Sequence, residues 1–244
     1  MGISLKDFGS SGAKVWQDDL NPSKTYGVIG PGARSFNLND ALAFDDTTLR
    51  PSAFVNTLVG TSPITSGLTS GYPLLITTGA TEYNGVNVQL FGESAKLATT
   101  TDVRISAKML ASEEKTVDLL FGLAEQKTDL CKLSTAHGVL ATGVAGVFFF
   151  KVSGASETTI YVKSYVSGAE TASVAVGTLG KVDPVELGLQ WDGAKVHAFV
   201  DGVEKAVFTG SLPAGELTPS YNFRTGATAA FTLSFSDLSY AVAT

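Results

Sequence analysis

The chain has a single cysteine, Cys131, and only two histidines, His137 and His197, among its 244 residues. One thiol excludes an internal disulfide and any zinc site built on cysteines, and we interpret Cys131 as a small buried hydrophobe. The histidines show none of the His-x-x-x-His or Glu-x-x-His spacings that hold a metal or a proton relay. We therefore expect neither a metal nor a cofactor.

Clusters of positive charge and long apolar runs are also missing. Lys and Arg number 17 against 23 Asp and Glu, which gives a net charge of −6. Phosphate binding draws its affinity from clustered Lys and Arg, so the balance argues against a nucleic-acid partner and against a membrane surface. No apolar run approaches the ~20 residues that span a bilayer. No secretory signal is visible either, so we expect synthesis in a cytoplasm.

The residues that are present predict an ordered, β-rich protein. A hydrophobic content of 44% with 16% charged residues is typical of a packed chain and not of a disordered one. From Leu74 onward, short apolar or alternating segments recur about every ten residues between Gly, Asn, Asp and Ser, which predicts an all-β sandwich or barrel. "DVRISAKML" alternates like a strand with one solvated face, whereas "GVFFF" is typical of a central strand.

Residues 1–70 have a different pattern. Pro and Gly in "NPSK", "GPG", "LRPS" and "TSPITSG" interrupt it about every dozen residues and exclude long strands or helices. Large apolar side chains nevertheless recur through the segment, at Phe8, Trp16, Tyr26, Phe36, Phe44 and Phe54. We predict an irregular, extended N-terminal segment over 1–70 that is ordered by a surface, either its own sandwich or another chain. A β-sandwich over 71–244 should follow it.

The patterns that could carry chemistry favour structural roles. Gly30 and Gly32 lack the third small residue and the long helix of a dinucleotide site, so we interpret them as a Pro-Gly turn. A Ser/His/Asp triad stays possible, but no Gly-x-Ser-x-Gly elbow supports one. Glu114 and Asp118 would share a strand face, as the two carboxylates of a glycosidase must. They flank a lysine, however, and we assign both to solvent. His197 should face solvent or a neighbour.

The stretch "VELGLQWDGAKVHAFVDGVEKAVF", residues 185–208, contains two Asp-Gly corners. Asp192-Gly193 and Asp201-Gly202 are hairpin dipeptides, because Asp tolerates left-handed geometry and Gly adopts positive φ at no steric cost. We predict three short strands folded back on each other and a structural role for both aspartates. The first strand should bury one face, formed by Leu187, Leu189 and Trp191.

This stretch resembles the penultimate hairpin region of concanavalin A-like, laminin-G-like jelly rolls, where a strand ending in Trp-Asp-Gly precedes one ending in Val-Asp-Gly. "DLLFGLAE" and "FTLSFSDLSYAV" are similar to other strands of that fold. The resemblance covers residues 74–244 and implies a jelly-roll sandwich of two antiparallel sheets. The laminarinase-type Glu-x-Asp-x-x-Glu strand and the acidic-Asn loops of legume-lectin calcium sites are absent, so we expect no enzyme.

The pattern of the whole chain resembles tailed-bacteriophage head decoration proteins, in which an extended N-terminal piece precedes a jelly roll rich in small residues. This resemblance implies a structural virion protein on the outer capsid surface, a homo-oligomer bound to the major capsid protein. Its interface anchors would be Trp16, Tyr26, Phe36 and Phe44, since aromatics dominate interface energetics. The alternative is a carbohydrate-binding module or host-receptor adhesin, because a jelly roll presents a concave sheet on which an exposed aromatic can stack a sugar.

Overall fold

The computed structural model contains strands and no helix within the residues that it describes. These are 3–8, 13–18, 25–28, 34–37, 54–62, 64–65, 74–90, 95–97, 102–128, 130–131 and 136–243. The all-β prediction is therefore confirmed for this part of the chain. No described helix could cross a membrane.

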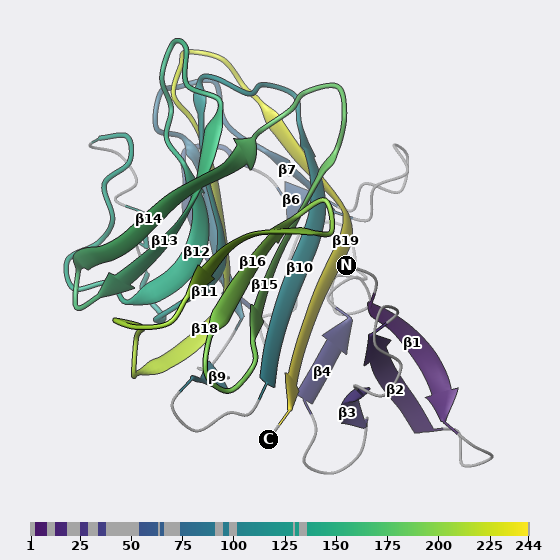
Figure 1. The fold of residues 1–244 in the computed structure, drawn as a ribbon. Helices are drawn as coiled ribbons and strands as arrows, with labels where there is room; N and C mark the ends of the chain where they lie inside the picture. The colour runs from purple at the N-terminus through teal and green to yellow at the C-terminus, as the bar shows by residue number, and fades with distance from the viewer. Residues whose placement is uncertain are drawn as a thin grey trace.

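Two antiparallel sheets of eight strands each pack face to face (Figure 1). The first sheet has the order β17-β16-β15-β10-β19-β7-β6, with β4 paired to β19. Its strands are β4 (Arg34–Asn37), β6 (Ile64–Thr65), β7 (Leu74–Thr77), β10 (Asp102–Ala111), β15 (Val185–Trp191), β16 (Val196–Val200), β17 (Val203–Phe208) and β19 (Thr232–Ala243).

The second sheet has the order β14-β13-β12-β11-β18-β8-β5, with β9 paired to β18. Its strands are β5 (Phe54–Val59), β8 (Gly85–Leu90), β9 (Ala95–Lys96), β11 (Val117–Ala124), β12 (Gly146–Lys151), β13 (Thr159–Val166), β14 (Ala169–Thr178) and β18 (Glu216–Thr225). The two sheets confirm the predicted jelly-roll sandwich.

The first 70 residues supply short strands to three sheets. A separate three-stranded sheet consists of β1 (Ile3–Phe8), β2 (Ala13–Asp18) and β3 (Thr25–Val28). By contrast, β4 pairs with β19, β5 with β8 and β6 with β7, so these three strands belong to the sandwich sheets. The domain boundary at residue 70 stays a prediction. Three strands that precede this boundary, β4, β5 and β6, are nevertheless paired with strands of the sandwich.

Alternation along the strands builds the core between the sheets. In β10, the side chains of Val103, Ile105, Ala107 and Met109 are buried as predicted, and Lys108 is exposed. The solvated face is shorter than expected, because Arg104 is buried as well. The central position of "GVFFF" is confirmed, since β12 lies between β11 and β13 and is buried throughout. The predicted burial is also confirmed for Leu187, Leu189, Trp191 and Cys131.

Both Asp-Gly corners turn the chain as expected. Asp201 and Gly202 have φ angles of 51° and 74°, and two positive φ angles between paired strands are typical of a type I′ hairpin. The Asp201 Oδ1 also accepts a hydrogen bond of 2.9 Å from the Glu186 backbone N–H. Asp192 Oδ1 accepts bonds from the two backbone N–H groups that close its loop, at 2.9 and 2.7 Å. The aspartates thus have the structural role that the sequence predicts.

Candidate functional site

The outer face of the second sheet, which points away from the main core, carries a polar row on β8 and β18. Gln89 stands opposite Ser220, and Asn87 stands opposite Asn222. Gln89 Nε2 donates to Ser220 Oγ at 2.8 Å, and its Oε1 accepts from the Lys127 backbone N–H at 2.8 Å. Asn87 Nδ2 donates to the Lys127 carbonyl at 3.3 Å. The segment that follows β11 therefore lies over this row and occupies it.

Asn222 differs from Gln89 in this row: it is fully buried, and among the described residues neither the nitrogen nor the oxygen of its side-chain amide has a hydrogen-bond partner. Beside the row, an apolar cluster packs the same segment onto the sheet, and it contains Leu120, Ala124, Leu130, Cys131, Val144, Phe148 and Phe150. The middle of this face is thus covered by the chain itself.

A charged cluster occupies one end of the same face and corrects the assignment of Asp118 to solvent. Asp118 is only 1% exposed. Its Oδ2 accepts from Arg224 Nε at 2.5 Å and lies 2.8 Å from His137 Nδ1, while Oδ1 accepts from the Ser153 backbone N–H at 2.6 Å. Arg224 is itself fully buried. The prediction for Asp118 was wrong because β18 places a buried guanidinium directly opposite it.

Both carboxylate oxygens of Asp118 already have hydrogen-bond partners, which limits its possible catalytic roles. A glycosidase acid or nucleophile must approach the scissile bond and a second carboxylate across it. Asp118 instead neutralises Arg224 and ties His137 to the sheet. Glu114 lies outside the strand, which begins at Val117, so the two acids do not share a strand face.

An aromatic strip lies at the β13 side of the outer face. Tyr161 and Tyr165 alternate with buried residues of β13 and are themselves half-buried. Lys163, between them, holds its Nζ 5.7 Å from the ring centroid of Tyr161. Glu170 on β14 accepts from Lys163 Nζ at 2.7 Å and from the Tyr165 hydroxyl at 2.9 Å. Burial, together with this bond to Glu170, raises the pKa of Tyr165 to about 12.

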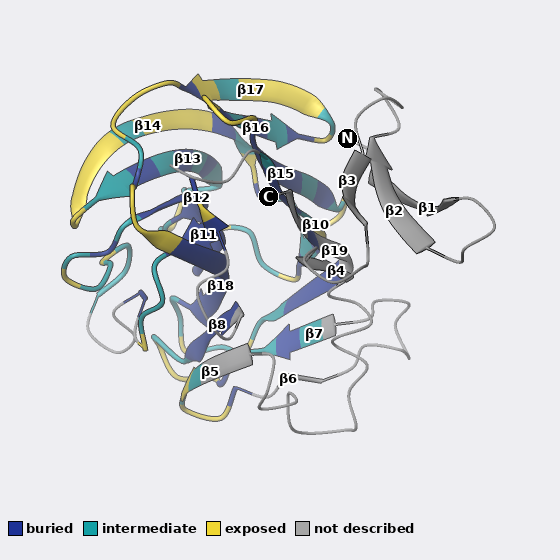
Figure 2. Cartoon of the chain, turned by 90° about the horizontal axis from the view of Figure 1, so that it is seen from below, coloured by how far each residue is buried: buried dark blue, intermediate teal, exposed yellow. Residues whose placement is uncertain are grey.

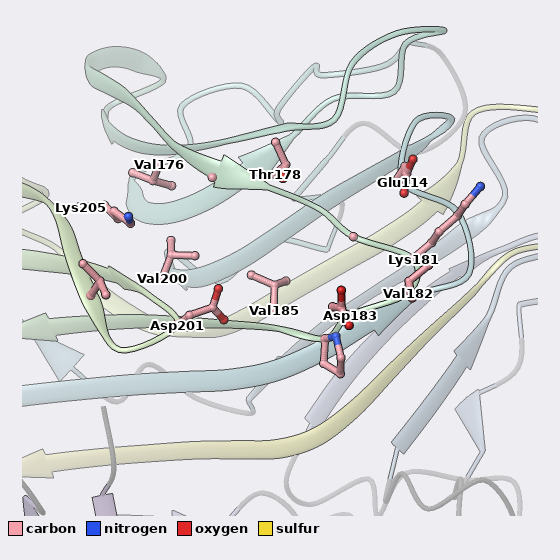
Figure 3. Close-up of a pocket in the computed structure, with 14 residues that line it drawn as sticks. Glu114, Val176, Thr178, Lys181, Val182, Asp183, Val185, Val200, Asp201 and Lys205 are labelled. Carbon is pink, nitrogen blue, oxygen red and sulfur yellow. The ribbon is translucent and has the colours of Figure 1, made fainter.

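A cleft of about 650 Å³ opens where the edges of the two sheets meet, between β14 and the β16–β17 hairpin (Figure 3). Its floor is formed by Val176, Val185 and Val200, which are buried members of the main core. Val182 and Val203 stand at its mouth and are 78% and 55% exposed. The charged residues of its rim are Glu114, Lys181, Asp183, Asp201 and Lys205. Figure 2 shows the exposed surfaces of β14 and β17 on this side of the molecule.

His197 faces a neighbour, as predicted. Its Nδ1 lies 2.6 Å from Glu204 Oε2 and its Nε2 lies 3.0 Å from Asp192 Oδ2. Desolvation by itself would raise the pKa of Asp192, but the hydrogen bonds from His197 and from the loop backbone outweigh it and lower this pKa to about 2. Within the described residues, no group of three His, Cys, Asp or Glu side chains could hold a metal ion.

The backbone register places three of the four predicted interface anchors. Trp16 on β2 stands opposite Tyr26 on β3, and Phe36 on β4 stands opposite Tyr240 on β19. Phe44 and the Pro-Gly turn at Gly30 lie outside the described residues. Their role toward a partner stays a prediction.

The sequence analysis did not identify the aromatic strip on β13, although the sequence contains a pattern that indicates it. In "TTIYVKSYV", Tyr161 and Tyr165 share the face of Lys163 by simple alternation, and this pattern marks an outward aromatic pair. The valine cleft had no such signal, because its floor and mouth come from β14, β15, β16, β17 and the loops between them.

Comparisons with known proteins place the chain by fold. No family model matches it, and no curated protein matches its sequence. Among solved structures, the carbohydrate recognition domain of Emp47p has a TM-score of 0.59 at 10% identity, covering 84% of this chain and 93% of that one. The Bacillus licheniformis β-glucanase has a TM-score of 0.56 at 12% identity, covering 87% and 98%. The Crh5 transglycosylase in complex with NAG has a TM-score of 0.59 at 12% identity, covering 90% and 87%.

These similarities show the fold, a concanavalin A-like jelly roll that lectin-like and glycosidase structures share. At such low identity they show the fold alone. The resemblance to phage head decoration proteins gains no support from them.

Proposed function

We propose that this protein binds carbohydrate and does not cleave it. The observation that carries the proposal is the outward strip of Tyr161 and Tyr165 beside Lys163 and Glu170. Aromatic rings offer a flat apolar surface to the C–H groups of a sugar, and a few charged or polar groups nearby can pair with its hydroxyls. The jelly-roll fold shared with the carbohydrate recognition domain of Emp47p supports the same function.

The non-enzymatic part of the proposal rests on the carboxylates. Glycosidic cleavage uses a pair of carboxylates on either side of the bond. On the outer face of the second sheet, Asp118 is buried and bonded to Arg224, and Glu170 is bonded to Lys163 and Tyr165. Both carboxylates are engaged by these partners, which supports recognition without hydrolysis.

Affinity electrophoresis against immobilised β-glucan, chitin and mannan tests the proposal. We expect at least one of these to retard the wild type, and Tyr161→Ala and Tyr165→Ala each to weaken binding about 3- to 10-fold, since an aromatic contact is worth ~0.5–1.5 kcal/mol. Phe199→Ala is the matched control, because Phe199 is a half-buried aromatic on a strand of the other sheet. Equal loss in the control, or release of reducing sugar by the wild type, would overturn the proposal.

Attachment to a phage capsid is a second candidate, and the separate β1–β2–β3 sheet favours it. This sheet carries Trp16 and Tyr26 on paired strands, and aromatic anchors are typical of interface centres. We propose that it would contact a major capsid protein on the outside of the virion. A major capsid gene beside this one, with loss of capsid co-sedimentation on deletion of residues 1–28, would support this candidate. Unchanged co-sedimentation would contradict it.

A further inference from the structure

The aromatic strip on β13 is accompanied by one cation, Lys163, which is already engaged inside the protein. Its Nζ donates to Glu170 Oε2 at 2.7 Å. The same Nζ lies 5.7 Å from the ring centroids of both Phe150 and Tyr161, and an ammonium is attracted to the faces of such rings. The Lys163 side chain is only 18% exposed. Its positive charge is therefore satisfied by the protein and is not presented to a ligand.

Glu170, the partner of this cation, is more exposed than Lys163, with 40% of its side chain open to solvent. Its Oε2 accepts from both Lys163 Nζ and the Tyr165 hydroxyl, whereas its Oε1 has no hydrogen-bond partner within the described residues. The hydrogen bond from Lys163 is the main reason that the pKa of Glu170 lies below its usual range, so the carboxylate is charged at neutral pH. The outer atom of the pair is thus an anionic acceptor, which suits the hydroxyl donors of a sugar.

We propose that Glu170 makes the aromatic strip selective for uncharged glycans, because it neutralises Lys163 and keeps this cation from an anionic ligand. A glycan with uronic-acid or sulfate groups would meet the exposed carboxylate, and it could pair with Lys163 only by displacing Glu170. The net charge of −6 repels such a ligand as well. A neutral glycan uses the ring faces and the hydroxyl-accepting oxygen without this repulsion. The inference rests on the proposed carbohydrate binding and names the class of glycan that the strip accepts.

Binding of the full chain to beads that carry polygalacturonate, compared with beads that carry β-glucan, chitin or mannan, tests the proposal. We expect the wild type to bind at least one neutral glycan and not polygalacturonate. Glu170→Gln should acquire binding to polygalacturonate and raise the ratio of anionic to neutral affinity about 5-fold, the gain of one charge pair near water. Sodium chloride at ~0.5 M should remove this gain, because salt screens exposed charges.

Two further variants separate the local effect from the change in net charge. Glu204→Gln is the matched control, because Glu204 is exposed to a similar extent, 47%, and is bonded to His197 on the other sheet. It removes the same charge and should bind polygalacturonate no better than the wild type. Adding Lys163→Gln to Glu170→Gln should abolish the acquired binding, because the cation that Glu170 had neutralised is then gone.

The outcomes distinguish this inference from the proposed function. Wild-type protein that binds polygalacturonate as well as a neutral glycan would overturn the inference alone. The same holds for an equal gain in Glu204→Gln, for a gain that persists without Lys163, and for a Glu170→Gln variant that is folded by circular dichroism but acquires no binding. Wild-type protein that binds no glycan of either class would overturn the proposed function, and this inference with it.

Discussion

Replacing Asp118 by asparagine should destabilise the protein more than any surface change, because it removes one partner of a buried ion pair. Asp118 is 1% exposed and Arg224 is fully buried, with 2.5 Å between the carboxylate and the Nε atom. Leaving a buried charge without its partner lowers the free energy of unfolding by about 3–5 kcal/mol. For a chain of this length, that corresponds to a decrease in Tm of roughly 6–20 °C.

Urea unfolding followed by far-UV circular dichroism measures this change at neutral pH. Glu114→Gln is the control, since Glu114 lies in the turn before β11, and its effect should stay within about 0.5 kcal/mol. The double variant Asp118→Asn with Arg224→Met should be less destabilised than the sum of the single variants, because it no longer buries an unpaired charge. A loss below ~1 kcal/mol in Asp118→Asn, or strict additivity in the double variant, would refute the reasoning.

Four other changes test the fold. Gly202→Val should lower the free energy of unfolding by about 1–3 kcal/mol in urea melts, because Gly202 has a φ of 74° that a β-branched residue adopts only under strain. Its carbohydrate binding should be intact. Burial lowers the pKa of Lys151 from 10.5 to about 8, so between these pH values the unfolded chain binds more protons than the folded chain. The free energy of unfolding should therefore rise from about pH 8 to pH 10.5. The Lys151→Met variant should lack this rise. Deleting residues 1–28 should leave a folded sandwich by circular dichroism. Deleting residues 1–60 should instead produce aggregation in sedimentation, because it removes β4 and β5 from the sheets and exposes the edges of their partner strands.

Local patterns predicted the strands and corners because their causes are local. Alternation in β10 follows from the two-residue period of a strand, and the Asp201-Gly202 corner follows from the φ angles that these two residues tolerate. Both are confirmed by burial and by backbone angles. Leu187, Leu189 and Trp191 follow the same rule.

The environment of Asp118 could not be predicted in this way. Its partner Arg224 lies 106 residues later in the chain, and the pairing exists only because β11 and β18 are neighbours in that register. His137 arrives from a loop that follows β11. In the sequence, a nearby lysine favoured a solvent-exposed position for Asp118. In the fold, the neighbouring strand places the buried guanidinium of Arg224 beside it. Burial of Arg104 in β10 also escaped the alternation pattern.

The covering of the second sheet determines how strongly the protein could hold a sugar chain. Its polar row is occupied by the backbone around Lys127, and the middle of its face is packed by the cluster around Leu120 and Phe148. The strip on β13 is half-buried at the edge of this face, where the Tyr165 ring stacks on Phe148 with 5.6 Å between the ring centroids. A ligand confined to two rings would bind weakly at a single site.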